Sequence, residues 1–302
     1  MNSTRNEKVV VCPLCEGHLH WEMPFFDQVS QSVVCRGHDY HWRACLSCGN
    51  GYPSSTPPLE ELQQYWNKNR VEGVTAAEAS AVAAQRLGYA DSWAQKTWAF
   101  VTPHCKKRTG RFLDIACGLG STVRRFQDGG WDAYGIDADP NTKAVHEKQG
   151  IKSTIGQFEN IGTDKKFDLI SIAHAIYFVT DPRTFVRTVR SSLAEGGLFL
   201  VVISDLTSTL SDGLPTQMHT WYPAAKALES VFSAEGLRIV RRHKVKGSVL
   251  MLFKKVDKAT HQQRGAYFSA FALRSHRLRY LIVGKPLVTT VRTAKRIASR
   301  LF

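Results

Sequence analysis

The sequence predicts an α/β protein: a parallel sheet covered by helices on both faces, a small cysteine-rich module before it and a basic helical tail after it. Three observations predict this arrangement. Short apolar runs alternate with helical stretches between Arg111 and Val202, five of the seven cysteines lie between positions 12 and 48, and the positive charge is concentrated after position 237. Apolar, β-branched runs that alternate with helices are typical of parallel sheets buried on both faces.

Length and composition exclude several protein classes. The 302 residues suggest about two domains, and 43% hydrophobic with 22% charged residues is an ordinary globular composition rather than a disordered or collagen-like one. No apolar run reaches the roughly 18 residues of a membrane span. The segment up to Val11 is polar and lacks the basic-then-apolar pattern of a secretory signal. We therefore expect a cytoplasmic protein.

The cysteines near the N-terminus form two CxxC pairs, Cys12–Cys15 and Cys45–Cys48, separated by 29 residues. Each pair places two thiolates on one turn, and together they predict a tetrahedral zinc site of four cysteines. Such a site leaves no position for substrate water, so we expect a structural zinc. Cys35, His38 and His41 lie between the pairs and are alternative ligands. A redox CxxC would explain one pair but not two.

The segment after the module is predicted to be helical. Breaker residues at 52–58 end the module, and helices are expected over Leu59–Asn69, Thr75–Leu87 and Asp91–Val101, the last with Asp91 as its N-cap. We expect four parts: the zinc-ribbon module at 1–55, a linker and helical segment at 56–108, the sheet domain at 109–256 and the basic tail at 257–302.

The sheet domain is predicted element by element from its apolar runs. Strands are expected at 112–116, 133–137, 152–155, 167–173 and 198–203, helices at 122–128, 141–149, 182–193 and 223–235, and a closing hairpin at 237–242 and 248–254. Lys246–Gly247 marks the turn of that hairpin.

The turn Ala116–Gly120, between the first of these strands and its helix, indicates a ligand site. Its small residues let the backbone approach a ligand, and free amides of the following helix face it. Asp114 lies just before the turn, and Asp137 ends the next strand, where a ribose diol can donate two hydrogen bonds to it. A dinucleotide fold would show GxGxxG, which is absent here.

The stretch LDIACGLG at 113–120 resembles the first motif of class I S-adenosylmethionine-dependent methyltransferases, which commonly reads LDIGCGxG. Four further stretches match that family in order: GIDAD at 135–139, GQFE at 156–159, FDLISIAHAIYFVTDP at 167–182 and EGGLFLVV at 195–202. The match covers about residues 100 to 255. It implies a Rossmann-like, seven-stranded methyltransferase domain that binds S-adenosylmethionine.

The resemblance also implies which residues surround the cofactor. They are Asp114, Ala116, Gly118 and Gly120 at the methionine part, Asp137 at the ribose, Gln157 and Phe158 at the adenine, and Cys117, Ala138 and Ala173 within the same motifs. Ala116 replaces the family's usual glycine. Cys117 is better explained as a small buried thiol than as a nucleophile. Tyr177 and Phe178 stand where many relatives have Glu-His, so no catalytic role is transferred to them.

Two histidines are candidate catalytic residues. Methyl transfer needs the acceptor in line behind the methyl group, and a hydroxyl acceptor also needs a base, for which imidazole is suited. His174 follows the fourth strand at the edge where ligands bind, and His219 lies in a stretch similar to one that covers the acceptor in relatives. The alternatives are an indirect hydrogen bond and a helix cap. Asp205 and Tyr177 are weaker candidates, and Trp221 and Tyr222 are candidates for stacking on a sugar.

The order of the CPLC pair, the CxxCG pair, the linker and the methyltransferase domain resembles zinc-ribbon methyltransferases among sugar- and polysaccharide-modifying enzymes. This resemblance implies a small-molecule or glycan acceptor. Some ribosomal RNA guanine methyltransferases also carry a CPLC module, so RNA is the alternative acceptor. A third alternative is a non-catalytic binding protein that uses the module and the tail as contacts.

The positive charge is local. From Arg238 to Phe302 there are 17 Lys or Arg residues and a single acid, Asp257, within a chain of net charge +14. Apolar positions from Leu287 onward recur at helical spacing, which predicts a basic amphipathic helix. Three roles are open: contact with the anionic inner-membrane surface, binding of nucleic acid, and a helix docked on the domain.

Overall fold

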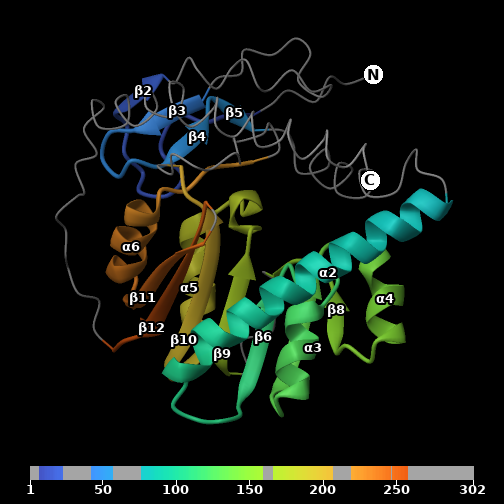
Figure 1. Cartoon of the computed structure of the whole chain (residues 1–302). Coiled ribbons are helices and arrows are strands. Elements are labelled where there is room, and N and C mark those ends of the chain that lie inside the picture. The colour runs from blue at the N-terminus through green and yellow to red at the C-terminus, as the bar shows by residue number, and fades with distance from the viewer. Residues whose placement is uncertain are drawn as a thin grey trace.

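The computed structural model describes residues 7–22, 42–56, 76–158, 166–206, 219–245 and 247–257. Figure 1 shows the central sheet with the cysteine module at one end of it. The alternative ligands Cys35, His38 and His41, the helix expected at 59–69 and the basic tail after Asp257 lie outside the described residues.

A seven-stranded mixed sheet forms the centre of the domain, in the order β11-β12-β10-β9-β6-β7-β8. Its strands are β6 (Arg111–Ile115), β7 (Asp132–Asp137), β8 (Ser153–Ile155), β9 (Phe167–Ala173), β10 (Leu193–Ser204), β11 (Leu237–Val245) and β12 (Ser248–Lys255). The first five are parallel, and β12 runs antiparallel to both β10 and β11. The predicted strands and the closing hairpin are confirmed, and the fold is Rossmann-like.

Helices cover both faces of this sheet. They are α2 (Ala76–Val101), α3 (Ser121–Asp128), α4 (Lys143–Lys148), α5 (Pro182–Ser192) and α6 (Ala225–Ala234), with 3-10 turns η2 (Thr102–His104), η3 (Pro140–Thr142) and η5 (Ile176–Phe178). Along β10, Leu198, Leu200 and Val202 pack with the α2 and α3 side, whereas Phe199 and Val201 pack with α5 and α6. This alternation follows from the two-residue period of a strand, and it explains why residues 198–203 of β10 are all apolar.

One sequence prediction about the helices is wrong. The two helices expected at 75–87 and 91–101 form a single helix, α2, that continues through Gly88 and Asp91. Asp91 is therefore not an N-cap; its carboxylate lies 3.2 Å from the Arg124 guanidinium on α3. The tertiary contact with α3 outweighs the local capping pattern.

The module consists of two small sheets. The strands β2 (His20–Glu22), β3 (Trp42–Cys45) and β4 (Gly51–Pro53) form an antiparallel sheet, and β1 (Glu7–Lys8) pairs with β5 (Ser55–Thr56). The buried side chains of Leu14, Trp42 and Tyr52 belong to the same apolar cluster as the α5 and α6 side of the domain. Among the described helices, none has the length and apolar character needed to cross a membrane.

Candidate functional site

The loop that leaves β6 has the backbone conformation that small residues allow. Ala116, Gly118 and Gly120 all have positive φ, at 55°, 56° and 77°. A Cβ on Gly120 would lie 2.5 Å from Ile151 Cδ1, so this glycine is required for packing. A Cβ on Gly118 would meet nothing within 4 Å. The loop is therefore anchored to the protein at Gly120 and faces open space at Gly118.

Two buried carboxylates lie beside this loop. Asp114 accepts a hydrogen bond from Ser171 Oγ at 2.5 Å. Its burial, together with the nearby charge of Asp137, raises its pKa to about 7, and the bond from Ser171 opposes this rise. Asp137 accepts hydrogen bonds from the backbone N–H of Gly118, at 2.6 Å, and of Asp139, at 2.9 Å. Asp137 thus holds the loop in place in addition to standing at the predicted ribose position.

The other predicted cofactor residues take up different positions. Cys117 is buried, and a Cβ on Gly135 would lie 2.5 Å from its Sγ, so the thiol fills the space that this glycine leaves. Ala138 and Ala173 are exposed at the carboxyl ends of β7 and β9, and Gln157 is half-buried. The ring of Phe158 packs in the core, 4.9 Å from that of Phe185.

His174 lies directly after β9, at the carboxyl edge of the sheet. It has a positive φ of 53°, its backbone N–H donates to Val202 O, and its Nε2 lies 3.5 Å from Ser248 Oγ. The edge of its ring meets Trp93 of α2, with centroids 5.4 Å apart. Burial lowers its pKa to about 4, so the ring is neutral at pH 7.

His219 lies in an aromatic cluster. Its ring centroid is 5.1 Å from that of Tyr177, 5.0 Å from Phe178 and 5.4 Å from Tyr222. Burial lowers its pKa to about 3. Tyr177 and Phe178 belong to η5, the turn that begins two residues after His174, so the structure brings both predicted histidines to the end of β9.

The residues after His219 form hydrogen bonds to η5 and to the residue that follows it. Thr220 donates through N–H and Oγ1 to Tyr177 O, both at 2.9 Å, and Trp221 Nε1 donates to Val179 O at 2.9 Å. Asp205 accepts from the N–H of Ala225 at 3.1 Å, at the first turn of α6. Trp221 is fully buried, which excludes stacking on a sugar, and Asp205 has the capping role expected of an acid after a strand.

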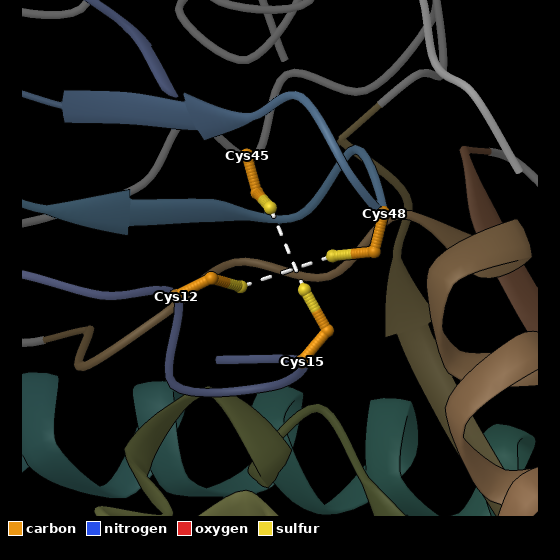
Figure 2. Close-up of side chains that lie close together, drawn as sticks. All are labelled: Cys12, Cys15, Cys45 and Cys48. Atoms are coloured by element: carbon orange, nitrogen blue, oxygen red, sulfur yellow. Dashed lines mark hydrogen bonds between the residues drawn. The ribbon is translucent and has the colours of Figure 1, made fainter. Parts of the chain in front are cut away.

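The four cysteines of the two CxxC pairs converge, as Figure 2 shows, and their sulfur atoms all lie within 4.8 Å of one another. Cys12 and Cys48 are separated by 3.8 Å between Sγ atoms, and Cys15 and Cys45 by 3.5 Å. Sulfur atoms bound to one tetrahedral zinc at about 2.3 Å lie about 3.8 Å apart, whereas disulfide sulfurs lie about 2.05 Å apart. The spacing and the donor set therefore fit a tetrahedral thiolate site and do not fit disulfides.

The two CxxC turns are built alike. In the first, Glu16 N–H donates to Cys12 O at 2.8 Å, and in the second, Gly49 N–H donates to Cys45 O at 2.9 Å. Glu16 and Gly49 both have positive φ, at 59° and 81°. Each turn closes four residues after its first cysteine, which directs both thiols of the pair to the same point.

The module and the domain meet beside the aromatic cluster. Gly51 of β4 and Tyr222 form an isolated antiparallel bridge, with N–H to O distances of 2.9 and 2.7 Å. Glu16 of the first CxxC turn pairs with Arg183 of α5, which also lies 3.7 Å from Glu235. Tyr222 stacks on Tyr177 at 5.0 Å. The cysteine module is thus joined, through Tyr222, to the turn that follows β9.

Sequence reasoning missed several residues of this site, among them Trp93, Ser171 and His146. His146, on α4, is buried and contacts both the glycine loop and β8. A lone histidine in a short helix carries no signal in the sequence, because its partners are 28 and 7 residues away along the chain.

Comparison with known proteins gives consistent matches. A family model described as a methyltransferase domain matches residues 83–242, just over half of the chain. An uncharacterized methyltransferase of Staphylococcus carnosus is 27% identical over 96 residues, 31% of this chain and 46% of that protein, so the chain spans about half the length of this curated relative.

Two solved structures are similar. The 1,6-didemethyltoxoflavin-N1-methyltransferase of Burkholderia thailandensis is 16% identical, with a TM-score of 0.45, over 62% of this chain and 93% of that chain. The glycopeptide N-methyltransferase MtfA is 16% identical, with a TM-score of 0.45, over 55% of this chain and 94% of that chain.

Proposed function

This chain belongs to the methyltransferase-domain family of S-adenosylmethionine-dependent enzymes, and from that premise we propose that it methylates a hydroxyl of a small-molecule or glycan acceptor. When bound, the cofactor supplies a methyl group on a positively charged sulfur. The chain's own residues bind it, orient the acceptor and exclude water, which is where most of the rate enhancement of a methyl transfer arises.

The observation that carries the proposal is the glycine loop with its two acids. Gly118 faces open space, and Asp114 and Asp137 lie beside it at the carboxyl edge of the sheet, where open α/β sheets bind ligands. Asp114 suits the cationic methionine part, and Asp137 at the end of β7, with Ala138 after it, suits the ribose. Gln157, in the described part of the next loop, is half-buried and has surface to offer the adenine.

On the acceptor side we assign the base to His174 and a packing role to His219. His174 directly follows β9 and is neutral at pH 7, so a ring nitrogen is free of a proton and able to accept one. Trp93 lies against it and offers a partly exposed aromatic surface for an apolar sugar face. His219 is enclosed by three aromatic rings, which suits a residue that holds η5 in position.

The four-cysteine cluster is proposed to hold a structural zinc. The thiol spacing supports this assignment, and four protein ligands leave no position for a reacting group. The bridge between Gly51 and Tyr222 supports a further role for the module, which is to support the acceptor side of the site from outside the sheet.

Calorimetric titration of the full chain with S-adenosylmethionine and with S-adenosylhomocysteine tests the cofactor half of the proposal. We expect both to bind, and Asp137→Asn to weaken binding about tenfold because it loses one of its two charged acceptor oxygens. Asp132→Asn, at the other end of β7 and exposed to solvent, is the matched control and should bind normally. An unaltered chain that gives no heat with either compound would contradict the proposal and favour a non-catalytic binding protein.

Methyl transfer to a panel of sugars, sugar nucleotides and glycans tests the acceptor half. With the acceptor that is methylated, His174→Ala should lower kcat by a factor of about 10² or more and leave cofactor affinity unchanged. His219→Phe should retain activity. Loss of activity in His219→Phe alone would reverse the two assignments.

A polyanion such as RNA is the second candidate acceptor, and one observation favours it. Arg238, Arg241, Arg242 and Lys244 are exposed along β11, the edge strand of the sheet. Arg241 Nη1 lies 3.1 Å from His104 Nε2, which joins this strip to the exposed cations of the loop 106–108. Clustered cations of this kind neutralise phosphates.

Binding of ribosomal RNA fragments at increasing salt tests this candidate. If RNA is the acceptor, Arg238→Glu with Lys244→Glu should abolish salt-dependent binding, and Lys143→Glu on α4 should not. Methylation of a glycan by the double variant at the normal rate would eliminate RNA as the acceptor. The membrane-contact role expected of the basic tail is tested separately, with anionic vesicles and the full chain.

A further inference from the structure

His146 makes two hydrogen bonds at the floor of the cofactor loop. It lies on α4 with 1% of its surface exposed. Its Nε2 is 2.8 Å from the carbonyl oxygen of Gly118, and its Nδ1 is 2.7 Å from the hydroxyl of Ser153 on β8. Both ring nitrogens of a buried imidazole are therefore engaged by groups on other elements.

The partners determine where the protons lie. A carbonyl oxygen only accepts, so Nε2 of His146 must carry a proton and donate it to Gly118 O. In the neutral ring, Nδ1 then accepts from the Ser153 hydroxyl. The Gly118 carbonyl thereby sets the tautomer, and the Ser153 hydroxyl, which can donate as well as accept, supplies the partner that Nδ1 then needs.

Gly118 is held from both directions. Its N–H donates to Asp137 Oδ2 at 2.6 Å, and its C=O accepts from His146. The ring of His146 also lies under the end of the loop, because a Cβ on Gly120 would be 3.2 Å from His146 Cδ2. The histidine thus contacts the loop at the residue that faces open space and at the residue that anchors it.

We propose that His146 is a positioning residue for the cofactor, which fixes the backbone of Gly118 through Nε2 so that the loop keeps the conformation the ligand needs. This inference rests on the proposed function, since it assigns the loop to S-adenosylmethionine. His146 does not touch the reacting atoms; it acts through Gly118.

Two amide substitutions separate the two hydrogen bonds. In His146→Gln the amide nitrogen takes the place of Nε2 and can still donate to Gly118 O, whereas in His146→Asn it takes the place of Nδ1 and reaches only toward Ser153. We expect His146→Asn to weaken S-adenosylhomocysteine binding about tenfold and His146→Gln to remain within about threefold of the unaltered chain. Phe232→Leu, at a core position of α6, is the control for loss of stability without loop contact.

Hydrogen exchange provides a readout that needs no cofactor. The amide of Gly118 should exchange faster in His146→Asn than in His146→Gln. In Phe232→Leu it should exchange at the rate of the unaltered chain, when each protein is measured at the same number of degrees below its own melting temperature. Equal cofactor affinities and equal Gly118 exchange in the two amide variants would overturn the proposal. If neither S-adenosylmethionine nor S-adenosylhomocysteine binds the unaltered chain, the proposed function fails. The comparison of Gly118 hydrogen exchange in the two amide variants still decides whether His146 fixes the loop.

Ser153→Ala is a second variant, for the case in which His146 variants do not fold. It leaves the Gly118 bond possible but removes the hydrogen-bond partner of Nδ1, which helps to hold the ring in place. We expect a smaller loss, about threefold, in S-adenosylhomocysteine affinity, with the melting temperature little changed. An affinity identical to that of the unaltered chain would overturn the role of Ser153 in holding His146 against the loop.

Discussion

The sheet domain and the cysteine module differ in what stabilises them. The strands of the domain bury apolar side chains on both faces, as the alternation along β10 shows. The described strands of the module are two to four residues long, and the large apolar side chains that its described part buries are Leu14, Trp42 and Tyr52. A unit of that size does not form a sufficient core on its own. We therefore expect its stability to depend on the four-cysteine cluster and on the neighbouring domain.

The two regions are nevertheless joined by one apolar cluster and by the Gly51–Tyr222 bridge. Tyr222 in turn stacks on Tyr177, in the turn after β9. Loss of order in the module should consequently reach the acceptor side of the site while leaving the glycine loop, which lies on β6, unaffected. This asymmetry is the basis for the predictions that follow.

The largest expected effect comes from breaking the thiolate cluster. Cys48→Ser should abolish the binding of one zinc per chain and lower the free energy of unfolding by several kcal/mol, because metal binding contributes directly to the folding of a small module. Metal analysis and thermal unfolding measure both effects. Methyl transfer should fall with them, while affinity for S-adenosylhomocysteine should change little.

Cys105→Ser is the control for this variant, since Cys105 is a free thiol outside the cluster. It should retain the metal and the stability of the unaltered chain. A chain with all four cysteines that binds no zinc, or that keeps its melting temperature in a strong chelator, would contradict the dependence of the module on a metal.

The next largest expected effect is a loss of folding stability in acid, caused by His219 beside the contact between the cysteine module and the domain. Burial lowers the pKa of His219 from 6.5 to about 3, so between these values the unfolded chain binds a proton that the folded chain does not. The resulting loss in the free energy of unfolding is absent above pH 6.5 and grows as the pH falls toward 3. His219→Phe should reduce the loss of stability in that window by on the order of 3 kcal/mol.

Denaturant unfolding at pH 7 and pH 4.5 measures this effect. Substitution of the exposed His243 by Gln should leave the pH dependence of stability unchanged. If His219→Phe and the unaltered chain lose the same free energy of unfolding between the two pH values, the burial of His219 does not account for the loss of stability in acid.

A smaller effect is expected in the glycine loop. Burial raises the pKa of Asp114 to about 7, so its charged form increases as the pH rises through that value. A charged Asp114 favours the cationic methionine part, and cofactor affinity should rise by up to about tenfold between pH 6 and pH 8. Asp114→Asn should bind more weakly and show no such rise. Calorimetric titration with the cofactor at the two pH values measures this effect. If the affinity of Asp114→Asn also rises between pH 6 and pH 8, Asp114 is not the source of the rise.

The sheet was predictable from the sequence because its information is local. Runs such as FDLISIA at 167–173, with buried side chains on both faces, have the length and composition of a strand, and the residue pair Lys246–Gly247 in the sequence predicted a turn between the two strands that form β11 and β12. The continuation of α2 through Asp91 was not predictable, because it depends on Arg124 of α3. A capping pattern carries no information about a partner that lies 33 residues away.

The site was predictable to the same extent. The spacing of small residues and acids predicted that the loop, Asp114 and Asp137 lie together, and the paired CxxC turns predicted that four thiols converge. The hydrogen bond from Gly118 to Asp137, the contact of His146 with Gly118 and the bridge from Gly51 to Tyr222 were not predictable. Each of these joins elements that only the folded sheet brings together, so no local pattern encodes it.

The smallest expected effect concerns the one non-glycine residue in the loop with a positive φ. Ala116, at φ 55°, holds a conformation that costs an L-residue with a side chain about 1–2 kcal/mol. Ala116→Gly removes this cost but adds freedom to the unfolded chain worth about 0.4–1 kcal/mol. We expect a net gain of up to about 1 kcal/mol in stability, measured by thermal unfolding. Ala138→Gly, at a residue without positive φ, should instead destabilise the protein, and equal destabilisation by both variants would show that Ala116 carries no strain.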